Sequence, residues 1–168
     1  MQVIIGLGNP GAQYAGTRHS AGMMLVDLLS QKLGADYGWR KHYGSLVYKT
    51  PDLILVKTKD VFMNESGRLL QGLPSGELYV AHDDLDVKLG EYKVQRGIGP
   101  KVHYGMQSVE NALGTKDFWR IRIGVDNRDA ANRTPGEEYV LQKFLPPERQ
   151  TLDQVLEKIA SEILKTNS

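Results

Sequence analysis

The sequence predicts an α/β domain of three layers, with a mixed, mostly parallel twisted sheet flanked by helices. Short apolar runs typical of buried strands alternate with segments in which apolar residues recur every three or four positions. Strands interleaved with helices build this architecture. The length of 168 residues suits one domain of ordinary size. Because the sequence contains no internal repeat and no linker-like stretch, we expect residues 1–168 to form a single domain.

The composition is that of a globular protein and excludes several kinds of site. Hydrophobic residues make up 40% of the chain and charged residues 24%, and cysteine is absent, which excludes disulfides and thiolate metal sites. No apolar run approaches a membrane span, and the first residues lack the basic segment of a secretory signal, so we expect a cytoplasmic protein without membrane contact. A net charge of +1 argues against electrostatic coating of nucleic acid but allows a local basic patch.

The first part of the chain predicts a strand, a helix and a hairpin. Residues 2–6 predict a buried strand, and residues 19–33 repeat apolar side chains on one helical face before Gly34, a residue type that often ends helices. The apolar runs at 46–48 and 53–56 are separated by Thr-Pro-Asp, a turn signal that predicts a hairpin.

The rest of the chain continues the alternation of strands and helices. Residues 78–81 predict a central strand that ends on the acidic run 82–86. In residues 119–125 apolar and basic side chains alternate, which indicates a strand with one face exposed or turned toward a ligand. The other predicted elements are a short helix capped by Asn64 or Ser66 and stopped at Pro74, a strand at 89–94, a helix at 104–113, a loop at 127–136 and a last helix after Pro146-Pro147.

A glycine-rich loop, Leu7 to Gly22, joins the first strand to the first helix and carries polar groups at both ends. Asn9 lies at one end, and Arg18 and His19 lie at the other. Since such a loop can return to its strand, we expect Asn9 and His19 to share one pocket. The glycine spacing also matches a dinucleotide-binding fingerprint, but that fold requires the helix to open within the glycines, and here the helical pattern starts only at His19. We therefore interpret the glycines as a sharp turn beneath a pocket.

His19 is a candidate base, because the N-terminus of a helix lowers the proton affinity of an imidazole. A lone histidine is more simply explained as a hydrogen-bonded loop residue. The run His82-Asp83-Asp84-Leu85-Asp86 changes the balance, because it follows a predicted central strand and one of its aspartates could orient the imidazole. A metal site is the alternative, but the spacing matches no strong ligand pattern, so we expect no metal and no cofactor.

The segment Phe62-Met63-Asn64-Glu65-Ser66-Gly67 offers a second candidate amide. Asn64 is either the N-cap of the short helix or a donor to a substrate carbonyl, paired with Asn9. Both roles can hold together, because the side chain and the nearby backbone donors are separate groups.

Four segments of the chain resemble, in order and spacing, the sequence blocks of the bacterial-type peptidyl-tRNA hydrolases. These segments are Leu7–Gly22, Phe62–Gly67, Val80–Asp86 and Trp119–Gly124. The resemblance spans roughly residues 1–145. It implies an enzyme that cleaves the ester between a peptide and the 3′ ribose of tRNA without metal or cofactor, and so recycles tRNA during translation.

The resemblance also implies roles for individual residues. His19 matches the water-activating base, and Asp83 matches the carboxylate that orients it. Asn9 and Asn64 match the amides that hold the peptide near the ester, and Arg122 matches a basic residue that the family places against the 5′ phosphate of tRNA. We expect further substrate contacts from Tyr14, Met63, His103, Tyr104, Lys93, Arg96 and Lys101.

The loop 97–105 departs from the family pattern. Two glycines of the family are replaced by Lys101 and Val102, and an asparagine that positions substrate and water is replaced by Tyr104. A phenol cannot supply the paired donor and acceptor of an amide, and side chains restrict a loop whose glycines let substrate approach closely. Tyr104 could obstruct the peptide or stack on the terminal base of the tRNA.

Two further departures concern single positions. Ser20 stands where the family has an asparagine, and the lysine expected to bind phosphate aligns with Gln95, although Lys93 and Arg96 are adjacent. We still expect a basic, tRNA-facing patch around Arg122, because Trp119–Val125 alternates basic and apolar residues.

The sequence thus favours a monomeric esterase that binds the acceptor stem and 3′ end of peptidyl-tRNA and needs no obligate protein partner. One alternative is a member of the same fold that binds tRNA or another RNA without efficient hydrolysis, which Lys101 and Tyr104 favour. The presence of both His19 and Asp83 argues against it. A hydrolase of another aminoacyl ester is the remaining alternative.

Overall fold

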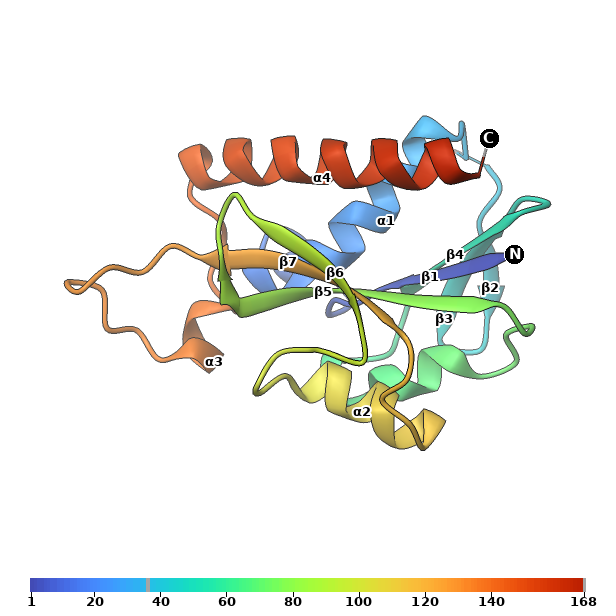
Figure 1. The fold of residues 1–168 in the computed structure, drawn as a ribbon, viewed down its shortest axis with the longest axis horizontal. Coiled ribbons are helices and arrows are strands. Elements are labelled where there is room, and N and C mark those ends of the chain that lie inside the picture. The colour runs from blue at the N-terminus through green and yellow to red at the C-terminus, as the bar shows by residue number, and fades with distance from the viewer. Residues whose placement is uncertain (36, 168) are drawn as a thin grey trace.

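A computed structural model describes residues 1–35 and 37–167, and within them seven strands form one sheet in the order β2-β3-β4-β1-β5-β7-β6 (Figure 1). The four central strands β4, β1, β5 and β7 are parallel, and the flanking strands β2, β3 and β6 are antiparallel to their neighbours. The strands are β1 (Gln2–Gly6), β2 (Arg40–His42), β3 (Ser45–Lys49), β4 (Leu53–Thr58), β5 (Glu77–Lys88), β6 (Tyr92–Arg96) and β7 (Trp119–Asp126).

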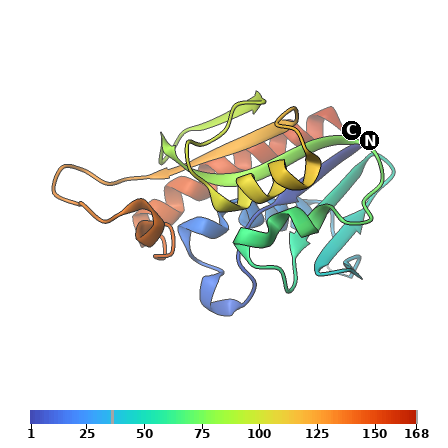
Figure 2. The ribbon, with the colours of Figure 1, turned by 90° about the horizontal axis from the view of Figure 1, so that it is seen from below.

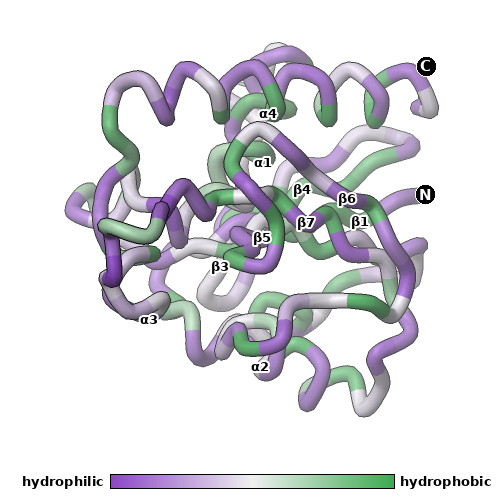
Figure 3. The backbone as a smooth tube through the Cα atoms, turned by 60° about the vertical axis from the view of Figure 1, so that its left-hand side comes forward, coloured by the Kyte–Doolittle hydropathy of each residue, from purple (hydrophilic) through white to green (hydrophobic). Residues whose placement is uncertain are grey.

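Helices cover both faces of this sheet, which confirms the predicted three-layer α/β class. α1 (Ala21–Lys32) and α4 (Pro146–Thr166) lie on one face, and α2 (Tyr104–Leu113) and the 3-10 helix η3 (Met63–Leu70) lie on the other (Figures 1 and 2). Hydrophobic and hydrophilic residues alternate along α4 in Figure 3, as expected for a helix with one face on the sheet. The shorter helices are η1 (Ala12–Tyr14), η2 (Arg18–Ser20) and α3 (Gly136–Tyr139).

The centre of the sheet is buried on both faces, and there β1 carries the apolar run Val3-Ile4-Ile5. Ile4 packs into the core that α1 and α4 cover, whereas Val3 and Ile5 pack into the core that α2 and η3 cover. A parallel strand covered on both faces reads as a continuous apolar run. The sequence Val3-Ile4-Ile5 is such a run, which is why β1 could be predicted.

Most of the predicted elements are confirmed, with small shifts in their ends. The hairpin of β3 and β4 forms as expected around Thr-Pro-Asp, and α2, β7 and α4 lie at their predicted places. The first long helix starts at Ala21 rather than His19, because the chain first makes the separate 3-10 turn η2. The strand predicted at 89–94 is β6 and begins at Tyr92.

Two details of the prediction are wrong. β5 does not end at the acidic run but continues to Lys88, because Asp83 and Asp84 still pair with β7. Neither Asn64 nor Ser66 caps the short helix η3, whose N-cap residue is Phe62 without a side-chain cap; the Ser66 hydroxyl instead donates to the Met63 carbonyl at 2.6 Å.

The expectation of an exposed basic face on β7 is also wrong. Arg120 and Arg122 are 2% and 7% exposed. β7 lies inside the sheet between β5 and β6, so its alternating arginines meet carboxylates instead of solvent. Arg120 Nη1 donates to Glu110 Oε1 of α2 at 2.7 Å, and Arg122 Nε donates to Asp84 Oδ2 at 2.8 Å.

Four short elements were not predicted: β2, η1 and η2 with three residues each, and α3 with four. Elements of this length show no hydrophobic period that a sequence pattern can reveal. Within the described residues, no helix is both long enough and apolar enough to cross a membrane.

Candidate active site

The candidate active site lies just past the C-terminal end of β1 and beside the middle of β5, where the chain folds back on itself. Leu7 N donates to Ala81 O at 3.0 Å, and Met23 N donates to Leu7 O at 3.0 Å. These bonds hold the start of α1 against the end of β1 and the middle of β5. As a result His19 lies beside Asp83, a residue 64 positions further along the chain. Catalytic groups of α/β sheets commonly gather at the carboxyl ends of strands.

His19 and Asp83 form a hydrogen-bonded pair. His19 Nδ1 donates to Asp83 Oδ2 at 2.8 Å, and the backbone N–H of His19 donates to Val140 O at 2.8 Å, which fixes the turn that carries the ring. The imidazole is partly open, with 14% of its surface exposed, whereas the carboxylate is 2% exposed. Because Asp83 holds the hydrogen on Nδ1, we assign Nε2 as the atom free to accept a proton.

His103 occupies the other oxygen of the same carboxylate. Its Nε2 donates to Asp83 Oδ1 at 2.8 Å, and its Nδ1 accepts from Met106 N at 3.1 Å as the N-cap of α2. The acceptor role of Nδ1 places the hydrogen on Nε2. Sequence reasoning placed His103 among the substrate contacts, but its polar atoms are used to hold Asp83, and its side chain is 4% exposed. Asp83 therefore cannot rotate away from His19 without losing two bonds.

The surroundings set the charge states of the pair. Burial by itself disfavours the charged imidazole, but the Asp83 carboxylate outweighs it and raises the pKa of His19 above its ordinary value. Burial would likewise disfavour the Asp83 carboxylate, but the charges and hydrogen bonds of His19 and His103 hold the pKa of Asp83 well below its usual range. Burial, together with His103, lowers the pKa of the neighbouring His82 to about 3, so His82 stays neutral.

Two amide side chains face the same space. Asn9 Oδ1 accepts from Met63 N at 2.8 Å, so its NH2 group is the end left to donate. Asn64, which follows Met63, is exposed, and both asparagines line the same cleft. The structure thus brings Asn9 to the same cleft as His19, with which it was predicted to share a pocket, and as Asn64, the amide predicted to pair with it. Met63 is 4% exposed and forms part of the cleft floor.

A cleft of about 820 Å³ opens above the His19–Asp83 pair. Of the predicted site residues, seven line it, including Tyr104, whereas Tyr14 and the four basic candidates do not. Tyr14 instead packs edge-on against Phe62 at 6.3 Å between ring centroids. Sequence reasoning missed one wall of the cleft, which has no motif of its own and is formed by Gly136, Glu137, Glu138, Val140 and Leu141.

His19, Asp83 and His103 lie close enough together to be considered as a metal site. The donor set does not fit one, because both imidazole nitrogens that face Asp83 carry hydrogens in this network. A metal at His103 Nε2 would force the hydrogen onto Nδ1, against the N–H of Met106. The arrangement instead suits a hydrogen-bonded triad that presents one free nitrogen, His19 Nε2, to the cleft.

The basic candidates differ in accessibility. Arg122 is tied to Asp84 and also donates from Nη1 to Gln95 Oε1 at 2.7 Å. Arg96 lies on the surface and pairs with Asp117. Lys93 and Lys101 are exposed.

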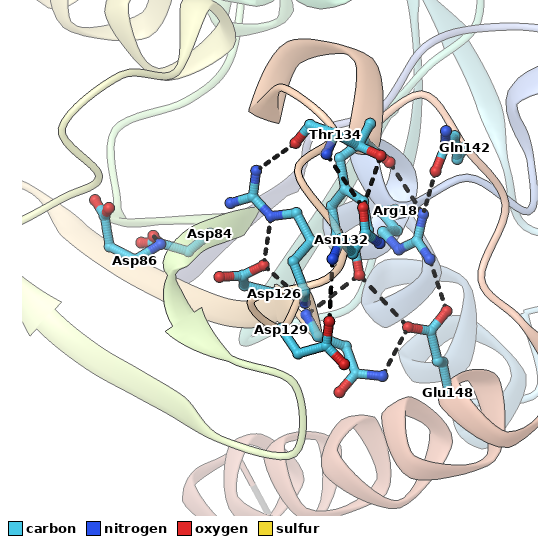
Figure 4. Close-up of polar contacts among 12 residues, drawn as sticks. Arg18, Asp84, Asp86, Asp126, Asp129, Asn132, Thr134, Gln142 and Glu148 are labelled. Atoms are coloured by element: carbon cyan, nitrogen blue, oxygen red, sulfur yellow. Dashed lines mark hydrogen bonds and ion pairs between the residues drawn. The ribbon is translucent and has the colours of Figure 1, made fainter.

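Arg18, the residue before His19, holds the missed wall against the catalytic turn (Figure 4). It is 3% exposed, and its Nη2 donates to Glu148 Oε1 at 2.7 Å, while its Nη1 donates to Tyr139 O at 3.1 Å. The guanidinium carbon lies 3.8 Å from the centroid of the Tyr139 ring. The backbone N–H of Arg18 also donates to Gln142 O at 3.1 Å. Adjacency to His19 was the only sequence signal for this role, since Glu148 lies 130 positions away.

The loop between β7 and α3 projects from the domain (Figures 1 and 2) and is organised by its own side chains (Figure 4). Arg128 Nη1 donates to Thr134 O at 2.9 Å, and the Thr134 hydroxyl donates to Asn132 Oδ1 at 2.7 Å. At the start of the loop, Asn127 Nδ2 donates to Glu148 Oε2 at 3.1 Å. The loop is thus connected to the carboxylate that binds Arg18.

Comparison with known proteins agrees with this geometry. A family model described as peptidyl-tRNA hydrolase matches residues 3–167. The chain belongs to the peptidyl-tRNA hydrolase family. Peptidyl-tRNA hydrolases of Mycobacterium marinum and Mycobacterium tuberculosis strain H37Rv are each 39% identical to it over 168 aligned positions, which cover 94% of this chain and 86% of the relative. A crystal structure of peptidyl-tRNA hydrolase from Acinetobacter baumannii matches with a TM-score of 0.80 and 26% identity, covering 97% of this chain and 86% of that chain.

Membership of the peptidyl-tRNA hydrolase family confirms the resemblance that the four sequence blocks carried. The structure shows where the departures in loop 97–105 lie. Val102 and Tyr104 line the cleft directly and Lys101 does not, so two of the three replaced positions belong to a wall of the site.

Proposed function

We propose that this chain hydrolyses the ester bond between the peptide and the tRNA of peptidyl-tRNA. The observation that carries the proposal is the His19–Asp83 pair in the lining of a cleft, in which Asp83 binds Nδ1 of His19 and leaves Nε2 as the nitrogen that can accept a proton. Membership of the family supplies the substrate class. The reaction releases tRNA for further rounds of translation.

The first step is attack of water on the ester carbonyl. His19 Nε2 takes a proton from the water as the new C–O bond forms, and the resulting imidazolium is stabilised by the Asp83 carboxylate 2.8 Å from Nδ1. The tetrahedral intermediate then expels the 3′ oxygen of the ribose, which receives the proton from His19. The products are a peptide with a free carboxylic acid and a tRNA with a free 3′ hydroxyl group, and the enzyme returns to its starting state.

The asparagines act on the carbonyl oxygen and on the peptide backbone. The NH2 groups of Asn9 and Asn64 face the cleft and can donate to the oxygen as negative charge develops on it. Asn9 is pre-oriented by its bond to Met63 N, so its donor is in place before the substrate arrives. Asn64 is exposed, so it adjusts to the substrate.

The acceptor stem of the tRNA lies, in this proposal, over the surface that carries Lys93, Arg96 and Lys101. These exposed side chains supply the charge for phosphate contacts. Arg122 lies in the same sheet beneath them and keeps only a minor share of this role, because its guanidinium is 8% exposed and donates to Asp84. Tyr14 reaches substrate only beside Phe62, at the outer rim of the cleft.

The test is release of the blocked amino acid from N-acetyl-aminoacyl-tRNA by purified protein, with and without a chelator. We expect turnover in both cases, and turnover that disappears in a His19→Ala variant, which still binds tRNA. Absence of turnover above buffer at high protein concentration would instead favour an RNA-binding protein, for which the exposed Tyr104 in the cleft, 57% accessible, is the specific support.

The proposal also covers the domain organisation, oligomeric state and location of the protein. We propose that residues 1–168 act as one domain, as a monomer in the cytoplasm, without an obligate protein partner. Sedimentation of the purified chain at the concentrations used for the release assay tests the monomeric state.

A further inference from the structure

Large apolar side chains gather around the mouth of the cleft, although they are exposed to solvent. Val102 is 76% exposed, Tyr104 57%, Leu141 49% and Phe62 47%, and all four line the cleft. They come from three separate segments of the chain, so local sequence does not explain their clustering. A contiguous exposed apolar patch on a protein surface marks a place where a ligand or partner binds.

Outside the group of His19, Asp83 and His103, the charged side chains that line the cleft are all negative. Besides His19, Asp83 and His103, the ionisable residues that line it are Glu137 and Glu138. No lysine or arginine lines this cleft within the described part of the chain. A carboxylate brought into the cleft would therefore meet the like charges of Glu137 and Glu138 and no lysine or arginine from the lining, whereas an apolar group would meet apolar walls.

The wall that carries Tyr104 is rigid. The residue before it, His103, is held by Asp83 at 2.8 Å. In the residue after it, Gly105, a Cβ atom would lie 2.5 Å from Met63 Sδ, so the start of α2 packs directly on the cleft floor. The backbone of Tyr104 is thus anchored on both sides before a substrate binds.

The geometry of the proposed reaction places one substrate group against this wall. The water that attacks the ester carbonyl must lie within hydrogen-bonding reach, about 3 Å, of His19 Nε2. The amino acid bonded to the ribose has its Cα directly on that carbonyl carbon. Its side chain therefore extends only a few bonds from His19, within the cleft that Val102, Tyr104 and Leu141 line.

We propose that Val102, Tyr104 and Leu141 form a specificity subsite that selects peptidyl-tRNAs whose ester-linked amino acid is apolar and rejects those in which it is acidic. This inference rests on the proposed ester hydrolysis. Positions 102 and 104 are where the chain departs from the glycine and asparagine of the family pattern, so the selectivity is a property of this chain. Val102 and Tyr104 fill space that glycine and asparagine would leave open, so an apolar side chain of the substrate can contact them.

The experiment compares three substrates on one tRNA body, chemically charged with N-acetyl-leucine, N-acetyl-serine or N-acetyl-glutamate. The tRNA contacts are identical, so the ratios of kcat/KM report the subsite alone. We expect the leucyl ester to exceed the seryl ester by at least about tenfold, since small differences in apolar volume give about 10–200-fold discrimination in a pocket. The glutamyl ester is expected to be slowest.

The variants locate the effect. In Val102→Gly/Tyr104→Asn the leucyl-to-seryl ratio falls to within about twofold of one, and Leu141→Ala lowers it from the other wall. Tyr37→Asn is the matched control, because Tyr37 is 97% exposed and does not line the cleft. This control keeps the wild-type ratio. A ratio that survives both wall variants overturns the proposal.

The outcomes separate this inference from the function on which it rests. Equal kcat/KM for the three esters overturns the subsite and leaves ester hydrolysis intact. If no ester is hydrolysed, the proposed function fails, and the subsite is tested by affinity for the three matching 3′-amide analogues, which cannot be cleaved. The same order of affinity, lost in Val102→Gly/Tyr104→Asn, supports the subsite, and equal affinities overturn it.

Discussion

Replacing Arg18 with methionine should destabilise the protein and slow the reaction together, because this one side chain joins the catalytic turn to the cleft wall. The change removes the guanidinium that binds Glu148 at 2.7 Å and the Tyr139 carbonyl at 3.1 Å, and it keeps a side chain of similar length. The backbone hydrogen bonds from Arg18 to Gln142 and from His19 to Val140 remain in this variant. The side-chain bonds that fix the cleft wall against the turn are lost.

The magnitude follows from the burial of the pair. Arg18 and Glu148 side chains are 4% and 6% exposed. Removing one partner of a buried ion pair costs about 3–5 kcal/mol. Glu148 keeps its bonds from Leu145 N at 2.8 Å and Asn127 Nδ2 at 3.1 Å, so we expect the lower end, about 3 kcal/mol. For a domain of this size that loss corresponds to about 6–12 °C in Tm.

The matched control is Arg149→Met, at the residue that follows Glu148. Arg149 pairs with Asp153 at 2.9 Å, but the two side chains are 44% and 56% exposed. We expect this control to lose less than about 0.5 kcal/mol. A second comparison is Arg18→Met/Glu148→Gln, which removes the stranded charge and should recover at least about 1 kcal/mol of the loss.

Chemical denaturation at two pH values tests the reasoning. Burial opposes the charge on Glu148, but bonds from Leu145, Asn127 and Arg18 outweigh it and lower the pKa of Glu148 below its ordinary value. Its contribution to the free energy of unfolding is therefore present above the ordinary glutamate pKa and is lost as pH falls through the lowered one. The difference between wild type and Arg18→Met should shrink in acid. The reasoning is refuted if Arg18→Met matches Arg149→Met, or if its loss is the same at pH 7 and pH 4.

Three further predictions concern the chemistry and the tRNA contacts. His19→Ala should lower kcat by about 10²–10⁴-fold with tRNA binding retained, and Asp83→Asn should lower it less; wild-type turnover in His19→Ala rules out the base. The rate should fall as pH drops through the raised pKa of His19, because the base must be unprotonated. Asp83→Asn should move the midpoint of this pH profile to lower pH, and an unmoved midpoint contradicts the pairing of His19 with Asp83. Lys101→Gln should reduce the slope of log affinity against log salt by about one unit, whereas Lys49→Gln, exposed on β3 outside the cleft, should not; equal slopes place the phosphate contacts elsewhere.

The sequence by itself determined the fold class and pointed to His19 and Asp83 as the proposed catalytic pair. Hydrophobic periods are local, so β1, the β3–β4 hairpin and α2 could be predicted where a run of apolar residues was long enough. His19 and Asp83 could be named because each lies in a short motif beside a predicted element. The motifs carried the family, which the match over residues 3–167 confirms.

Tertiary structure alone decided which groups meet. The alternation at Arg120 and Arg122 was visible, but only the strand order shows that β7 lies between β5 and β6 and that both guanidiniums are buried. The wall at Leu141 and the pair of Arg18 with Glu148 have no local signal, because they depend on residues more than 100 positions apart. A sequence pattern reports how a segment can bury its own apolar face, whereas the partner of a polar group is fixed by the packing of distant segments against each other.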